Sequence, residues 1–210
     1  MLWGGSNGSL ELRRSGDGSH RLRGTFPYGK AAVLSDGGRT GRPRKEVIAS
    51  GAFSYRIENP LEDIHFLVGH DYDHPLASKG TQTLSFRDTA AALLFEAVIT
   101  PAIAETAHGR DALALIGAGL AVGISPGFRI PPARTVPDAE EIEEEADDGS
   151  IDEDGQPRRG AIIRTIKAAL LYELSLVVRP AYPDAQIEAR NWAPHRATLQ
   201  APHPLNRWRL

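Results

Sequence analysis

Residues 172–177 read YELSLV, and this run is the strongest strand signal in the chain because apolar and polar side chains alternate along it. Glu173 and Ser175 fall on one face of the predicted strand, and Leu174 and Leu176 fall on the other. Burying a carboxylate or a hydroxyl without a partner costs several kcal/mol, so such residues normally find a polar neighbour. Glu173 is therefore expected to face a polar site and not the core.

The rest of the chain reads as a turn-rich fold with more strands than helices. The 21 Gly and 15 Pro residues argue against a mostly helical bundle. Alternating or continuous apolar runs predict further strands at 21–26, 31–34, 64–70, 90–99 and 122–130. Helical spacing predicts a short helix within 46–57 and a longer one within 101–120. In the predicted strand 64–70, His70 is expected to share a face with Phe66 and Val68.

Charge is distributed unevenly along the chain. The formal net charge of −3 comes from 24 basic and 27 acidic residues, but 11 of the acids lie in 138–154, a stretch without Lys or Arg, so the remainder carries +8. This composition predicts a solvated acidic loop at 131–159, inserted in a single domain at 20–190. The Gly- and Ser-rich residues 1–19 are predicted to be a flexible leader, and the basic tail 191–210 is predicted to be disordered.

Composition also excludes several classes of function. The absence of Cys excludes disulfides, thiolate nucleophiles and Cys-based zinc or iron–sulfur sites. The N-terminus lacks the pattern of a signal peptide, and the longest apolar run, 112–124, is shorter than the roughly 20 residues that a membrane span needs. Basic residues are scattered and not striped with aromatics, so nucleic-acid binding is not predicted. A soluble intracellular protein without a membrane partner is expected.

Three motifs place polar side chains inside or at the ends of predicted strands: VGHD at 68–71, GISPGF at 123–128 and the YELSLV run. His70, Ser125 and Glu173 are the parts of a nucleophilic acyl-transfer site, namely an imidazole base, a hydroxyl attacker and an anion that fixes the imidazole tautomer. A structural interpretation is also open, in which His70 is a hydrogen-bonded strand end, Ser125 a turn residue and Glu173 a carboxylate on the solvated side of an antiparallel sheet.

A metal site near His70 is the competing interpretation of the same region. His65, Asp71, Asp73 and His74 surround His70 in the sequence. On one strand, however, His65 and His70 are five residues apart and point to opposite faces, so both reach one ion only if the strand bends. The acidic run lacks the ligand spacing of an EF-hand, so calcium is not indicated. No metal or cofactor is predicted.

An ordered set of motifs resembles the prohead serine proteases of tailed bacteriophages, which are similar in fold to the herpesvirus assemblins. The motifs are GAF at 51–53, VGHD at 68–71 followed by HPL at 74–76, GISPGF at 123–128, and YELSLV at 172–177 closing on RPAYP at 179–183. The resemblance covers roughly residues 20–190. It implies an α+β fold, a mostly antiparallel β-barrel flanked by a few helices. It also implies that His70, Ser125 and Glu173 form a catalytic triad that needs no cofactor.

The same resemblance implies a serine endopeptidase that acts during procapsid maturation. Its expected substrates are the scaffold, the major capsid protein and the protease itself, inside the assembling procapsid in the host cytoplasm. Self-association into a homo-oligomer stays open. Two other interpretations also stay open: a catalytically inactive capsid-assembly protein with the same fold, and a small serine esterase or amidase.

Two features depart from the family pattern. Pro126 follows the proposed nucleophile and has no backbone N–H, so it cannot donate to an oxyanion, and a nucleophile-elbow arrangement is excluded. In the assemblins that the chain resembles, the oxyanion loop follows the third triad member, so the resemblance implies that the loop at 179–182 is the oxyanion loop. The acidic stretch 138–154 corresponds to no family motif. It is predicted to stay flexible beside the active site, where it would screen or gate basic substrate segments.

Overall fold

Two β-sheets and three short helices form the regular structure of the described residues. The computed structural model describes residues 11–38, 41–121, 123–151, 155, 159–180, 182 and 186–187. The larger sheet, here called the body sheet, contains β1 (Glu11–Arg14), β2 (His20–Pro27), β5 (His65–Val68), β6 (Asp71–Ser78), β7 (Leu84–Asp88), β8 (Ala92–Ile99), β9 (Gly123–Arg129), β12 (Leu170–Val177) and β13 (Gln186–Ile187). The smaller sheet contains β3 (Ala31–Ser35), β4 (Arg44–Ile48), β10 (Glu140–Glu144) and β11 (Ile162–Ile166).

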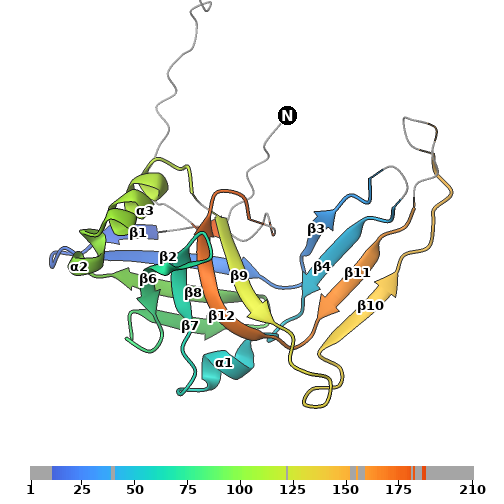
Figure 1. Ribbon diagram of the computed structural model, residues 1–210, viewed down its shortest axis with the longest axis horizontal. Coiled ribbons are helices and arrows are strands. Elements are labelled where there is room, and N and C mark those ends of the chain that lie inside the picture. Colours follow the sequence, from blue (N-terminus) through green and yellow to red (C-terminus); the bar gives the residue numbers. More distant parts are fainter. Residues whose placement is uncertain are drawn as a thin grey trace, which may run out of the picture.

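The smaller sheet forms an arm that extends from one side of the body (Figure 1). Its strand order is β10-β11-β4-β3, and the order in the body sheet is β6-β5-β12-β9-β13-β2-β8-β7, with β1 paired to β2. The helices are short: α1 (Ser54–Glu58), α2 (Pro101–Ala104) and α3 (Ala107–Gly117). None of the helices in the described residues is long and apolar enough to cross a membrane.

Most strand pairs of the body sheet are antiparallel, and β12 with β5 is a parallel exception. This agrees with the predicted mostly-β architecture carrying a few helices. The predicted barrel is not shown. The strands β6 and β7 stand at the two ends of the strand order, and within the described residues no ladder joins them. Within the described residues, the body sheet is therefore open.

The core lies against one face of the central strands. In β12, Leu174 and Leu176 are buried in the main apolar cluster, and in β9 Ile124 is buried there too. Two of the large aromatic side chains of the cluster, Phe26 and Phe53, meet edge to face with ring centroids 6.0 Å apart. Because side chains alternate along a strand, the residues between these positions point to the opposite face. That face carries the polar residues of β9 and β12.

Several predicted elements are confirmed, and others are wrong for local reasons. The predicted strands 21–26, 90–99 and 122–130 correspond to β2, β8 and β9. The predicted helix within 46–57 begins only at Ser54, because residues 44–48 form β4 and pair with β11. The predicted helix within 101–120 is split in two, since the Thr100 and Thr106 hydroxyls each cap a new helix start. The tail 191–210 lies outside the described residues.

Two segments predicted to be irregular contain strands. Within the predicted leader 1–19, Glu11–Arg14 forms β1 because Leu12 pairs opposite Leu22 of β2. Within the predicted acidic loop 131–159, Glu140–Glu144 forms β10, which pairs with β11. The prediction of a loop throughout 131–159 is therefore wrong for the residues of β10.

Counter-charges from other parts of the chain explain how the acidic strand pairs. Lys167 Nζ lies 2.7 Å from Glu141, and Arg164 Nε donates to Glu140 over 2.7 Å. Beyond the strand, Lys45 lies 3.3 Å from Glu145, and Arg42 lies 3.2 Å from Asp147. The Ala161 N–H and then Lys45 lower the pKa of Glu145. These groups are partly or largely exposed to solvent, so each pair contributes little, but together they offset the repulsion within the acidic segment.

A buried hydrogen bond fixes the base of the arm to the body. The Tyr182 hydroxyl donates to Glu46 of β4, and both side chains are buried. Arg164 donates to the other Glu46 oxygen over 3.2 Å. The Tyr182 ring packs edge to face on Phe26, with ring centroids 5.0 Å apart. Burial raises the pKa of the Tyr182 phenol well above its usual value, and the bond to Glu46 adds to the shift.

The first prediction concerns this link. Tyr182→Phe leaves a buried Glu46 oxygen without its donor, so it should lower the free energy of unfolding by about 1–3 kcal/mol at neutral pH. The exposed Tyr55, whose side chain has no hydrogen bond within the described residues, offers the control Tyr55→Phe, which should change stability by less than about 0.5 kcal/mol. Urea denaturation measures both. Equal effects of the two substitutions would contradict the assignment.

The same measurement has a pH dependence. A tyrosine ionises near its usual pKa of about 10 in the unfolded chain, whereas the raised pKa keeps Tyr182 protonated in the folded protein. The stability contributed by the Tyr182 phenol is therefore present below that pH and is lost as the pH rises toward the raised folded value. The difference between wild type and Tyr182→Phe should shrink above pH about 10. A constant difference across that range would oppose the prediction.

Candidate active site

The chain reverses at Gly69 and His70, between β5 and β6. Val68 pairs with Asp71, and the two residues between them have φ angles of 63° and 64°. Positive φ at both central positions is the geometry of a type I′ hairpin turn. His70 therefore does not continue the strand face of Phe66 and Val68, and that prediction is wrong. A non-glycine residue at positive φ is uncommon, and such positions cluster at functional sites.

His70 contacts Glu173 directly. The distance between His70 Nδ1 and Glu173 Oε1 is 2.7 Å, and the Glu173 side chain is 4% exposed while that of His70 is 45% exposed. A carboxylate acts as an acceptor, so this bond places the proton of a neutral imidazole on Nδ1. The other ring nitrogen, Nε2, is then an acceptor on a side chain that solvent or a ligand can reach.

Gly127 makes room for this carboxylate. Gly127 and Glu173 are opposite each other in the ladder of β9 and β12. A Cβ atom at position 127 would lie 1.9 Å from Glu173 Oε1 and 2.7 Å from its Cδ. The Glu173 side chain therefore lies across a position that only glycine can occupy without displacing it.

A β-bulge at Tyr172 sets the direction of Glu173. The register shifts between Leu171 and Glu173, so that Tyr172 is an extra residue on β12. This shift allows Leu171 and Leu174, three positions apart, both to reach the core. The Tyr172 ring stacks against the Arg56 guanidinium, whose carbon lies 4.1 Å from the ring centroid. The bulge thus occurs directly before the carboxylate, where it turns Glu173 to the polar face.

Ser125 stands opposite Ser175 in the same ladder. Opposite residues of an antiparallel pair project to the same face, with Cβ atoms about 4.5–5.5 Å apart. Ser125 is partly exposed, while its neighbours Ile124 and Pro126 are buried on the core side. No hydrogen bond joins Ser125 to His70 in this structure, and none of the described residues hydrogen-bonds its hydroxyl. The fold brings His70 and Glu173 into contact and places Ser125 on the same face.

Ser175 belongs to the same cluster, although sequence reasoning gave it no role. Its Oγ lies 2.6 Å from Glu173 Oε2 and 2.9 Å from the backbone nitrogen of His70. The signal for it was present in the YELSLV run, because residues 173 and 175 share a strand face. What the sequence could not show is that the turn at His70 reaches this face.

The other polar residues around His70 are paired separately. His65 Nε2 lies 3.6 Å from Asp63, and His74 Nδ1 lies 2.9 Å from Asp71. In the part of the chain that the structure describes, no group of three or more His, Asp or Glu side chains is arranged to hold a metal ion. The competing metal interpretation therefore has no cluster to support it among these residues.

A cavity of about 420 Å³ opens next to His65, the register partner of Glu173 on β5. Its other lining residues are uncharged: Pro75, Leu76, Ala77, Ser78, Thr81, Thr83, Thr100 and Ile103. The hydroxyls of Ser78, Thr81 and Thr83 hydrogen-bond to one another over 2.8–3.1 Å or to backbone groups. The lining therefore suits an uncharged group better than a charged one.

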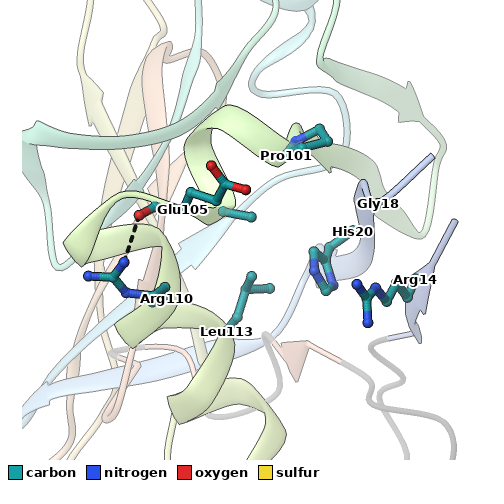
Figure 2. Close-up of a pocket in the computed structure, with 8 residues that line it drawn as sticks. Arg14, Gly18, His20, Pro101, Glu105, Arg110 and Leu113 are labelled. Carbon is teal, nitrogen blue, oxygen red and sulfur yellow. Dashed lines mark hydrogen bonds between the residues drawn. The ribbon is translucent and has the colours of Figure 1, made fainter. Parts of the chain in front are cut away.

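A second cavity, of about 370 Å³, lies between the β1–β2 end of the body sheet and the helices (Figure 2). Arg14 and His20 line one side, and Glu105 and Arg110 of the helical region line the other; Arg110 donates to the Glu105 carbonyl over 2.9 Å. Burial and then the nearby Arg14 lower the pKa of His20. This cavity shares no lining residue with the His70–Glu173 pair.

A family model for the caudovirus prohead serine proteases matches residues 31–198. The match covers more than half of the chain and includes His70, Ser125 and Glu173. The chain belongs to this family. It is a serine protease of viral capsid maturation, and membership implies capsid proteins as its substrates. The chain matches no curated protein and no solved structure.

The second prediction tests the fit between β9 and the carboxylate. Gly127→Ala should lower protease activity at least about 10-fold, because a Cβ atom 1.9 Å from Glu173 Oε1 forces the carboxylate away from His70. Gly117→Ala is the matched control, since a Cβ atom there meets nothing within 4 Å. Cleavage of a co-expressed capsid protein and a circular dichroism spectrum measure activity and folding. Full activity of the Gly127 variant would show that Glu173 does not need this position.

Proposed function

We propose that the protein is a serine endopeptidase that processes the scaffold, the major capsid protein and itself inside the assembling procapsid in the host cytoplasm. In this proposal Ser125 is the nucleophile, His70 the general base and acid, and Glu173 the anion that orients His70. The observation that carries it is the 2.7 Å contact between His70 Nδ1 and the buried Glu173 carboxylate.

The proposed reaction follows from the roles of the two imidazole nitrogens. Glu173 accepts the hydrogen bond from Nδ1–H, so Nε2 takes the proton of Ser125 as Oγ attacks the scissile carbonyl. The imidazolium that forms is stabilised by the Glu173 charge and then gives its proton to the leaving amine. A water molecule, deprotonated by the same Nε2, releases the acyl group from Ser125. No cofactor is needed for any of these steps.

The exposure of the His70 and Glu173 side chains suits these roles. A general base must meet its substrate, and the His70 side chain is 45% exposed. An orienting anion acts best where water does not compete for it, and Glu173 is 4% exposed. Catalytic hydrogen bonds are often long in the substrate-free enzyme and shorten when substrate binds. The absence of a hydrogen bond between Ser125 and His70 in this structure is therefore compatible with the proposed roles.

The oxyanion donors are proposed to come from the loop at 179–182, since Pro126 has no N–H to offer. A Cβ atom at Gly123 would lie 2.5 Å from Cδ of Pro180. Gly123 is two residues before Ser125 and on the same strand face, so Pro180 packs against β9 next to the proposed nucleophile. The exposed Arg179 precedes Pro180 and is the first residue of the loop.

The third prediction tests the proposed triad. Co-expression of the protease with its capsid protein and scaffold should shorten those proteins, as measured by intact mass. Ser125→Ala, His70→Ala and Glu173→Gln should each lower the cleavage rate by at least about 1,000-fold, because each removes a part that acts only as a unit with the others. Exposed residues of the same types supply the controls Ser85→Ala and His74→Ala.

The control variants should cleave at close to the wild-type rate. Persistent cleavage by Ser125→Ala would refute the assignment of the nucleophile. If the wild-type protease left the capsid protein uncleaved under conditions in which the virus matures its capsid, the proposed substrates would instead be refuted.

A further inference from the structure

Ser175 lies between the two members of the His70–Glu173 pair. Its Oγ is 2.6 Å from Glu173 Oε2 and 2.9 Å from the His70 backbone nitrogen, and the residue is fully buried. A serine hydroxyl has one proton to donate and lone pairs to accept. The carboxylate can only accept and the backbone N–H can only donate. The hydroxyl therefore donates to Glu173 and accepts from His70.

We propose that Ser175 is a positioning residue of the active site, which holds the Glu173 carboxylate and the His70 turn in one arrangement. This inference rests on the proposed function, because it gives Ser175 a role through two members of the proposed triad. It goes further in assigning a fourth side chain to the site and in explaining how a carboxylate on β12 and an imidazole on a hairpin turn are kept in register.

The geometry shows what is lost without the hydroxyl. Glu173 Oε1 is held by His70, and Oε2 is held by Ser175. Since Glu173 is almost fully buried, water does not replace a missing donor at Oε2, and a buried anionic oxygen without a donor is costly. The carboxylate would turn to share Oε1 or move toward solvent, and either movement changes its distance from Nδ1.

The second bond of the hydroxyl acts on the turn. His70 has a φ angle of 64°, which a residue with a side chain adopts at a cost. The Gly69 N–H donates to the Leu176 carbonyl over 3.0 Å, and the His70 N–H donates to Ser175. Two successive residues of the turn are thus bound to two successive residues of β12. Removal of the Ser175 hydroxyl leaves the turn with only the first of these bonds.

The same facts separate Ser175 from Ser125, which faces it across the ladder. The Ser175 hydroxyl is buried, so substrate cannot reach it. Its proton is donated to Glu173 in a hydrogen bond, so His70 Nε2 cannot deprotonate it. Ser125 is partly exposed and has no partner for its hydroxyl among the described residues. One serine of the pair is therefore arranged for attack and the other for support.

The fourth prediction compares four variants of the 210-residue chain. Ser175→Ala should lower kcat by about 10- to 100-fold with KM changed less than about 3-fold, because a hydrogen bond to a charged group is lost while the substrate surface is intact. Ser175→Thr and Ser175→Val have the same shape, but only Thr keeps the hydroxyl. Thr should therefore exceed Val in kcat by about 10-fold. The control is Ser19→Ala, which removes a buried serine bond of 2.7 Å to the Asp17 carboxylate outside the site and should leave kcat unchanged.

A spectroscopic readout separates positioning from general destabilisation. The Nδ1 proton of His70, bonded to Glu173 in the wild type, should give a far-downfield proton resonance that is absent in Glu173→Gln. The resonance should persist in Ser175→Thr and be shifted or lost in Ser175→Ala and Ser175→Val. Chemical denaturation of each variant, monitored by circular dichroism, establishes that the proteins compared are folded.

Labelling by a fluorophosphonate distinguishes failure of this inference from failure of the proposed function. Wild-type label on Ser125, with slower labelling of Ser175→Ala than of Ser19→Ala, supports both. Label on Ser125 at the same rate in Ser175→Ala and wild type, with equal kcat for Thr and Val, overturns the role of Ser175 and leaves the triad standing. Label on Ser175 itself overturns both assignments.

Discussion

The arrangement of the site depends on one buried negative charge, the carboxylate of Glu173. A carboxylate that is almost fully buried must have both oxygens hydrogen-bonded, since an unpaired buried charge is far more costly than any single packing contact repays. Here Oε1 is bonded to His70 Nδ1, and Oε2 is bonded to the Ser175 hydroxyl. The stability of the site and its proposed chemistry therefore have the same origin. The hydrogen bond from His70 Nδ1 offsets the free-energy cost of burying the Glu173 carboxylate, and it also orients the imidazole.

This charge also accounts for local features of the neighbouring strands. The carboxylate lies over β9, so position 127 must lack a Cβ atom. The carboxylate must also point away from the core while Leu171 and Leu174 point toward it, and a strict alternation cannot place both leucines on one face. The bulge at Tyr172 resolves this conflict, and the ring of this extra residue stacks against the Arg56 guanidinium. An irregular strand and a glycine are thus two consequences of one buried group.

The parts of the fold that were predicted correctly are those that local periodicity determines. Alternation in residues 172–177 identified β12 and the face of Glu173, because the period of a strand depends only on adjacent residues. The position of His70 was missed, since the turn requires Val68 to pair with Asp71 and the backbone to adopt positive φ at a non-glycine residue. The strand β10 was missed because its counter-charges Arg164 and Lys167 follow it in the sequence, outside the acidic run. The first error comes from the local backbone geometry of a tight turn, and the second comes from pairing between strands about 20 residues apart in the sequence.

The position of the arm constrains what its acidic strand can do to the site. The chain leaves the ladder of β9 and β12 after Arg129 and returns at Leu170, so β10 and β11 join β3 and β4 in the arm without interrupting the site strands. Ser125 lies four residues from that end, about 13 Å along the strand. That distance exceeds the Debye length of about 8 Å at physiological ionic strength, and several arm carboxylates are already paired with Arg42, Lys45, Arg164 and Lys167. The acidic charge therefore acts first within the arm itself, where Glu140 and Glu141 of β10 pair with Arg164 and Lys167. A direct effect on a basic substrate would be confined to the substrate residues that pass beyond the end of β9 and over the arm.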